Sequence, residues 1–335
     1  MSPHGPADGE AWRPEPPEPS TIRVLRPADG SLVGELAITP SADLPNRVRR
    51  ARRVQEGWAS LEPRDRVRRL GTLVDAVGRG AREIEETIVA ETGKPRSEAL
   101  VEILTVLDLL RYYLARAPSF LGPQRVSSGW LFWKTAAFTR EPLGVVGVIS
   151  PWNYPFILSM TPVLTALFGG NAVLLKPSEH TPYSGLLAED LAREAGLPEG
   201  LVQVIIGPGT TGDALVRSGL DKVVFTGGTE TGRRVMAAAA EDLTPVVLEL
   251  GGKDAAIILE DADLARAARG VAWGAFQNAG QTCISVERVF VAEKVYDEAR
   301  DNSAGDKAIV DAICRRADAA RVAEVWNTIH RCGRP

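Results

Sequence analysis

The stretch GVVGVISPWN, residues 144–153, joins a run of small and β-branched apolar residues to a polar turn. Helical segments separate this stretch from four further apolar runs: NAVLLKPS (171–178), LVQVIIG (201–207), KVVFTG (222–227) and TPVVLELG (244–251). Short apolar strands that alternate with helices are typical of a parallel sheet covered on both faces. The sequence therefore predicts an α/β fold with a doubly wound, Rossmann-like parallel sheet.

The carboxyl ends of these predicted strands carry the residues of chemical interest. In doubly wound sheets, ligands bind outside the carboxyl ends of the strands. We therefore expect one ligand site at this edge, built from the residues that end or follow the strands: Asn153, Lys176, Glu179, Gly207, Gly227 and Glu249.

Two hairpins and a helical region are expected before the sheet. Residues 22–36 fit a short hairpin with Asp29-Gly30 as its turn. Residues 45–117 have helical periodicity, and Gly93, followed by Pro95, is a plausible helix stop. The aromatic, β-prone stretch 127–144 predicts a projecting hairpin.

Two glycine-rich turns could hold a dinucleotide. Residues 207–212 fit the pattern G-x-G-x-x-G, but the next strand ends in FTGG without the acid that this fingerprint requires. The turn 225–232, FTGGTETG, could present backbone N–H groups to a phosphate, and Glu179 is a candidate for the ribose acid. The alternative is that these glycines only make tight turns.

Composition narrows the class of protein. The 335 residues are 44% hydrophobic and 24% charged, with a net charge of −4 and interspersed acids and bases. No basic face for nucleic acid and no bilayer-spanning apolar run stands out. The first 20 residues hold six prolines and no secretory signal. Three cysteines without an export signal favour free thiols in a reducing, cytoplasmic compartment.

Only three histidines are present: His4, His180 and His330. Two of them lie near the chain ends, which argues against a histidine-rich metal site. The same count makes a Ser-His-Asp or Cys-His mechanism improbable, so any chemistry here is expected to proceed without imidazole and without a metal.

Six strings together make the chain resemble the aldehyde dehydrogenase superfamily over roughly residues 22–297. They are ETGKP (91–95), PLGVVGVISPWNYP (142–155), GNAVLLKPSEHTP (170–182), VFTGGTETGRRV (224–235), LELGGKDA (248–255) and FQNAGQTC (276–283). The resemblance implies oxidation of an aldehyde to a carboxylic acid with NAD, or with NADP as the second choice.

The resemblance also implies residue roles. Cys283 is the expected nucleophile, Glu249 the general base and Asn153 the side-chain donor to the oxyanion. Cofactor contacts are expected from Ser150, Trp152, Lys176, Glu179, Gly209, Gly227, Gly228 and Thr229. Family members often have Ser where this chain has Gly228. Trp152 could instead be core packing, and Asn153 an ordinary turn residue.

Aldehyde oxidation needs a tetrahedral adduct first, and a thiolate adds readily to a carbonyl. Collapse of the thiohemiacetal on Cys283 would leave a thioester that water must cleave. Glu249 suits this step if partial burial raises its pKa. Transfer of the acyl group to coenzyme A is the alternative, although it needs no base. The Glu179 carboxylate would repel a 2′-phosphate, which favours NAD over NADP.

The resemblance ends near residue 298, and a truncated or frame-shifted reading frame is our hypothesis. A non-catalytic fragment that at most binds a dinucleotide is the alternative function, and the homo-oligomer expected by family is in doubt. The expected units are a disordered leader (1–20), a hairpin and helices of the cofactor domain (21–126), an oligomerisation-type hairpin (127–142), the dinucleotide-binding sheet (143–251), the beginning of a catalytic domain (252–298) and an unmatched tail (299–335).

Overall fold

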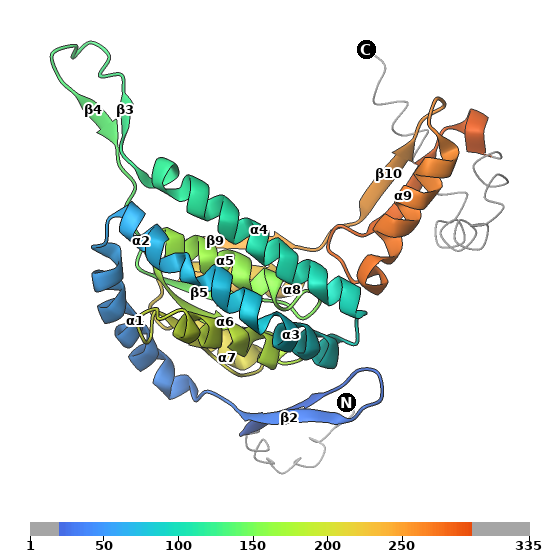
Figure 1. Ribbon diagram of the computed structural model, residues 1–335, viewed down its shortest axis with the longest axis horizontal. Helices are drawn as coiled ribbons and strands as arrows, with labels where there is room; N and C mark the ends of the chain where they lie inside the picture. The colour runs from blue at the N-terminus through green and yellow to red at the C-terminus, as the bar shows by residue number, and fades with distance from the viewer. Residues whose placement is uncertain (1–19, 297–335) are drawn as a thin grey trace, which may run out of the picture.

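A five-stranded parallel sheet forms the centre of the computed structural model, which describes residues 20–296 (Figure 1). Its strand order is β7-β6-β5-β8-β9, and every neighbouring pair is parallel. The strands are β5 (Val145–Ile149), β6 (Ala172–Lys176), β7 (Val202–Val204), β8 (Lys222–Gly227) and β9 (Val246–Leu250). The predicted α/β, doubly wound sheet is confirmed.

This strand order creates the ligand edge of the sheet. The chain starts at central β5, runs outward through β6 to β7, and then returns across β5 to β8 and β9. The order therefore reverses beside β5, and a crevice forms at such a reversal. The crossover helices are α5 (Ile157–Phe168), α6 (Pro182–Glu194), α7 (Gly209–Val216) and α8 (Thr229–Ala240).

Four helices precede the sheet and share one core with it: α1 (Leu44–Ala59), α2 (Pro63–Leu70), α3 (Thr72–Thr92) and α4 (Arg96–Leu121). A 3-10 turn, η1 (Ser41–Asp43), leads into α1. Gly93 ends α3 in the left-handed conformation, with φ 71°, as its position in the sequence predicts. The expected helical region is confirmed.

The first hairpin is confirmed, and the bounds expected for the second are wrong. Strands β1 (Thr21–Leu25) and β2 (Leu32–Ala37) pair antiparallel. In the second hairpin, β3 (Gln124–Val126) pairs with β4 (Ala136–Phe138), so the first strand precedes residue 127. The aromatic run 130–133, part of the β-prone stretch from which the hairpin was predicted, forms the connecting loop, because turn hydrogen bonds from Leu131 N–H to the Ser128 carbonyl and from Lys134 N–H to the Leu131 carbonyl close it.

A small C-terminal lobe follows β9. It contains β10 (Asp254–Ile258) paired in parallel with β11 (Val286–Val291), helix α9 (Leu264–Phe276) and the 3-10 turns η2 (Gln277–Gly280) and η3 (Glu293–Val295). No residue of α9 is buried, and Ile257, Trp273 and Ile284 are exposed. Apolar side chains of this lobe therefore reach the surface.

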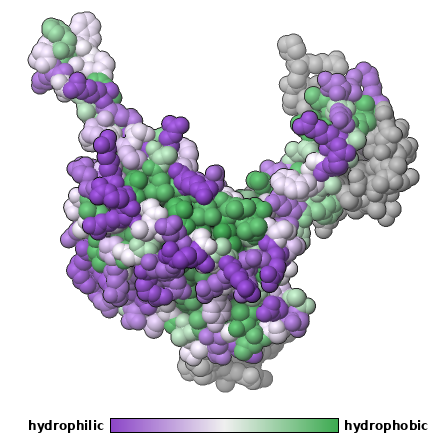
Figure 2. Space-filling view, in the orientation of Figure 1, coloured by the Kyte–Doolittle hydropathy of each residue, from purple (hydrophilic) through white to green (hydrophobic). Residues whose placement is uncertain are grey.

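Apolar residues also reach the surface outside this lobe. Figure 2 shows apolar side chains gathered over helices α4 and α5, between the β3–β4 hairpin and the C-terminal lobe. Within residues 20–296, no helix is long and apolar enough to cross a bilayer. The expected leader, up to residue 19, and the expected tail lie outside the described residues.

Candidate active site

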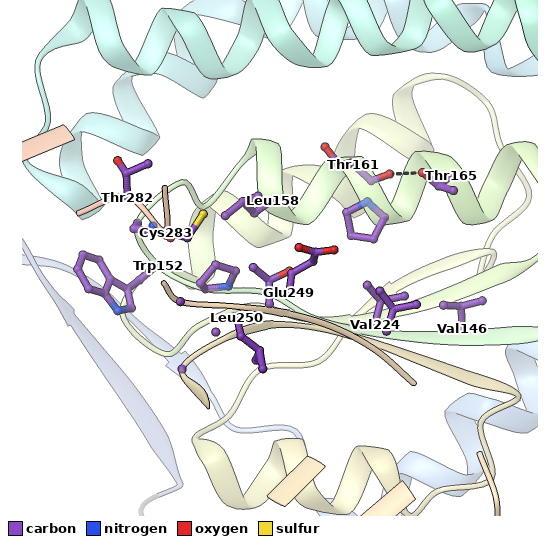
Figure 3. A pocket seen from close by; sticks show the side chains of 18 of the residues that line it. Val146, Trp152, Leu158, Thr161, Thr165, Val224, Glu249, Leu250, Thr282 and Cys283 are labelled. Carbon is purple, nitrogen blue, oxygen red and sulfur yellow. Dashed lines mark hydrogen bonds between the residues drawn. The ribbon is translucent and has the colours of Figure 1, made fainter. Parts of the chain in front are cut away.

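A cleft of about 930 Å³ extends along β5, β8 and β9 beneath helix α5 and brings the three expected catalytic residues together (Figure 3). Asn153 reaches it from the turn after β5, Glu249 from β9, and Cys283 from the loop before β11. Trp152, Gly227 and Gly228 also line this cleft. Asn153 and Cys283, which are 130 positions apart in the sequence, therefore share one space.

The loop that leads to Cys283 owes its shape to three consecutive left-handed residues. Asn278, Ala279 and Gly280 have φ values of 53°, 57° and 76°. Left-handed backbone is costly for a residue with a Cβ unless its surroundings enforce it. Buried Asn278 is held by its N–H, which donates to Glu98 at 2.9 Å, and by its amide, which donates to the Asn153 carbonyl at 2.9 Å. The resulting tight coil leaves Cys283 exposed as a free thiol at the cleft.

Asn153 and Tyr154 join the turn after β5 to the residues beside the thiol. The Asn153 amide donates to the Gln281 carbonyl at 2.8 Å, and the Tyr154 hydroxyl lies 2.9 Å from the Thr282 hydroxyl. One N–H of the Asn153 amide is therefore engaged next to Cys283. An amide carries two N–H donors, so the second one could serve an oxyanion on the sulfur side.

Glu249 faces the cleft from an open position, and its expected partial burial is wrong. Strand β9 lies at the edge of the sheet, and Glu249 is on its exposed side. The strand is apolar in sequence, which suggested burial, but an edge strand covered on one face alternates covered and open residues. The Glu249 carboxylate is therefore exposed, although it lines the cleft.

The ribose candidates lie together at the end of β6. Lys176 is buried, and its ammonium is 3.3 Å from the Glu179 carboxylate. Burial lowers the pKa of Lys176, against the effect of the Glu179 charge. Burial alone would raise the pKa of Glu179, but the Lys176 charge and hydrogen bonds hold it below its usual value. The pair thus presents a carboxylate acceptor and an ammonium donor, which suit ribose hydroxyls.

The glycines of the two turns differ in what an added Cβ would contact. A Cβ on Gly207 would come within 2.0 Å of the Thr211 hydroxyl, and one on Gly227 within 2.5 Å of the Phe225 ring. Packing alone therefore requires those two glycines. A Cβ added to Gly209, which begins α7, or to Gly228, the N-cap of α8, would meet no heavy atom within 4 Å.

The open space at Gly209 and Gly228 fits a ligand that approaches the backbone. Thr229 is the first residue of α8, so the unpaired N–H groups of that helix start point out of the sheet edge, where a pyrophosphate would gain from them. With the Lys176–Glu179 pair, these residues fit an adenine dinucleotide.

Some candidates do not join the catalytic cleft. Ser150 is buried, and its hydroxyl lies 2.7 Å from that of Ser159 inside the fold, so its side chain is not directed to a ligand. Lys176, Glu179, Gly209 and Thr229 lie outside the lining of the cleft, toward the ends of β6 and β8. The edge of the sheet therefore offers two neighbouring regions, one for the reacting atoms and one for a dinucleotide.

A buried ion pair behind Asn153 is absent from the sequence-based list of site residues. Lys94 and Glu102 lie 2.6 Å apart with side-chain exposures of 3% and 1%. The string ETGKP was noted only as a helix stop and a family string. The available signal was a lysine inside a helix terminator with a glutamate eight residues later on the apolar helix α4.

Among the described residues, no group of three potential metal ligands is present.

Comparison with known proteins gives one consistent result. The model of the family described as "Aldehyde dehydrogenase family" matches residues 12–308. A 4,4'-diapolycopene aldehyde oxidase of Methylomonas sp. is 47% identical over 282 residues, which are 83% of this chain and 53% of that protein. A putative succinate-semialdehyde dehydrogenase [NADP(+)] of Mycolicibacterium smegmatis is 38% identical over 280 residues, 82% of this chain and 54% of that protein.

Solved structures agree with this result. The crystal structure of an NAD-dependent aldehyde dehydrogenase from Sinorhizobium meliloti superimposes with a TM-score of 0.80 at 35% identity, over 84% of this chain and 56% of that chain. The chain thus spans little more than half the length of the relatives that it matches.

Proposed function

The chain belongs to the aldehyde dehydrogenase family, and from this premise we propose that it takes part in oxidising an aldehyde to a carboxylic acid with NAD or NADP. The observation that carries the proposal is the shared cleft of Asn153, Glu249 and Cys283. A thiol, a hydrogen-bond donor and a carboxylate around one space are the groups that covalent oxidation of an aldehyde requires.

Cys283 is the proposed nucleophile. Its thiolate adds to the aldehyde carbon, the carbonyl π pair moves to oxygen, and a thiohemiacetal oxyanion forms. The second N–H of the Asn153 amide stabilises this oxyanion. When bound, the nicotinamide supplies the hydride acceptor for this carbon. Lys176 and Glu179 would hold the ribose hydroxyls, and the start of α8 would hold the pyrophosphate.

Glu249 is the proposed base for the second half of the reaction. A water molecule that loses a proton to this carboxylate attacks the thioester carbonyl and releases the carboxylic acid and the Cys283 thiolate. The exposed Glu249 is accessible to the water that this step needs. We propose that thioester hydrolysis limits turnover in this chain, because water is a weaker nucleophile than a thiolate and must first be activated.

The lining of the cleft favours an uncharged, apolar aldehyde. Apolar side chains form most of its wall, among them Leu143, Val146, Leu158, Val224 and Val247. Lys222 is the one cationic residue in this lining, and it begins β8 at the opposite end from the residues around Cys283. An apolar chain gains about 25 cal/mol for each Å² that it buries. Within this lining, a carboxylate on the substrate would meet no cation on the side of Cys283.

The experiment is NADH formation by the full chain with NAD and either hexanal or succinate semialdehyde, beside Cys283→Ala. We expect a burst of NADH that is stoichiometric with protein, slower turnover afterwards, a preference for hexanal, and no NADH from Cys283→Ala. Absence of both burst and turnover from folded protein would overturn the proposal.

The second candidate is a fragment that binds a dinucleotide without turnover. The exposure of Glu249 and of the C-terminal lobe favours it, because water enters a site that hydride transfer requires to be closed. NAD binding by calorimetry without an NADH burst would support this function.

A further inference from the structure

The turn that carries Asn153 rests on a buried ion pair that the chemistry described so far does not use. The Lys94 ammonium donates to the Glu102 carboxylate at 2.6 Å and to the Asn153 carbonyl at 2.8 Å. The same carboxylate accepts from the N–H groups of Phe156 and Ile157, at 3.1 Å each. Three of these four hydrogen bonds therefore end on the main chain between Asn153 and Ile157.

These contacts fix the Asn153 peptide through its carbonyl, while its side chain reaches toward the residues before Cys283. Its carbonyl accepts from Lys94 and from Asn278, while its side-chain amide donates to Gln281. Lys94 also lies 4.4 Å from the centre of the Tyr154 ring, and that tyrosine contacts Thr282. Rotation of the Asn153 peptide would break the hydrogen bond to Lys94 and would swing the amide away from the thiol.

Burying two charges is costly, and an apolar pair of equal volume often stabilises a fold as well or better. A role in the active site explains why two charges are buried here, which packing alone does not explain. We propose that Lys94, held by Glu102, is a positioning residue that sets the direction of the Asn153 amide toward the oxyanion on Cys283. This inference rests on the proposed function, since it assigns Asn153 the oxyanion.

The test is a double-mutant cycle between Lys94 and Asn153 in the full chain. Lys94→Met is expected to lower the rate of the NADH burst about 10²-fold, as misplacing a catalytic group by about 1 Å does. The affinity for NAD and the alkylation rate of Cys283 by iodoacetamide should stay within about twofold, because the ribose residues and the thiol are untouched.

In an Asn153→Ala background, where there is no amide left to position, Lys94→Met should lower the burst less than threefold. Full additivity of the two substitutions would overturn the proposal, because it would mean that Lys94 acts without Asn153. Lys294→Met is the matched control: Lys294 also pairs with a glutamate, Glu260, at 2.7 Å, but on the surface. It should leave the burst unchanged.

A measurement without turnover separates this inference from the proposed function. Lys94→Met should speed amide hydrogen exchange at least tenfold across residues 153–157, with no change in β7. If the wild-type chain gives no NADH, the proposed function fails, and this exchange pattern still decides whether Lys94 fixes the turn. Unchanged exchange in a folded variant would overturn the positioning role.

Loss of Lys94 leaves the Glu102 charge buried and unpaired, which can unfold the protein. Lys94→Met with Glu102→Gln removes both charges and serves in that case. A double variant that folds and retains the full burst rate would contradict the proposal.

Discussion

Glu91 shows at the scale of a single residue how the fold places a carboxyl in an apolar interior. It is buried near the end of α3 and accepts hydrogen bonds from Tyr183 N–H, Ser184 N–H and the Ser184 hydroxyl at 2.6–2.7 Å, at the start of α6. Burial raises the pKa of Glu91 to about 7, even though these three donors act in the opposite direction.

This raised pKa predicts that stability falls as the pH rises. The unfolded carboxyl titrates near 4.5 and the folded one near 7, so the native state holds the extra proton between these values. The contribution to stability is complete below about pH 4.5 and is lost as the pH passes 7. The loss is on the order of 2 kcal/mol between pH 5 and pH 8. Urea unfolding at both pH values measures this loss. In Glu91→Gln, this part of the change in unfolding free energy between pH 5 and pH 8 should be absent. An equal change in the wild type and in Glu91→Gln would contradict the direction of the pKa shift.

Glu179 gives a prediction about cofactor choice at the same scale. Its carboxylate is held below its usual pKa and stays charged, so it would repel a 2′-phosphate while accepting from ribose hydroxyls. We expect Glu179→Gln to raise the ratio of NADP to NAD affinity about tenfold, which is one charge interaction of roughly 1.4 kcal/mol. Calorimetry with both nucleotides measures it. Glu199→Gln, which removes an exposed carboxylate bonded to Arg50, is the control and should leave the ratio unchanged.

At the scale of elements, most of the sheet and the helices followed from the sequence. Strands β5, β6, β8 and β9 lie within a residue or two of the apolar runs that predicted them, since β-branched residues between helices have few alternatives. The bounds of the second hairpin were less accessible, because the aromatic residues 130–133 have high β propensity and yet form its loop. The exposure of single side chains was harder to predict from the sequence. The exposure of Glu249 and the burial of Lys94 depend on contacts between segments that are distant in the chain.

The end of α3 gives a prediction at this scale, because Gly93 precedes Lys94 and has a φ of 71°. Gly93→Ala should lower the free energy of unfolding by about 1 kcal/mol, the cost of a Cβ in left-handed backbone. Gly57→Ala, inside α1 with nothing within 4 Å of the added Cβ, should raise it by roughly 0.5–1 kcal/mol. Urea unfolding of both variants checks the opposite signs, and a stabilising Gly93→Ala would show that α3 ends differently.

At the scale of the whole molecule, two parts project from the compact body: the β3–β4 hairpin and the C-terminal lobe (Figure 1). The hairpin loop presents Trp130, Phe132 and Trp133 with 95%, 85% and 66% of their surface exposed. An aromatic side chain buries roughly 150–250 Å² when it is covered, so three of them on one loop strongly favour association. Leu100 and Leu104 of α4 are exposed as well.

We therefore expect the chain to self-associate through the hairpin loop. Light scattering after size exclusion should give a mass above the 36.0 kDa of one chain, rising with protein concentration. Replacing Trp130, Phe132 and Trp133 together by Ser should lower the mass toward one chain, because these side chains contribute little to the core of the fold. Trp273→Ser, an exposed aromatic of α9, is the matched control. If only the control variant dissociates, the C-terminal lobe rather than the hairpin is the contact, and a single-chain mass at every concentration would exclude both.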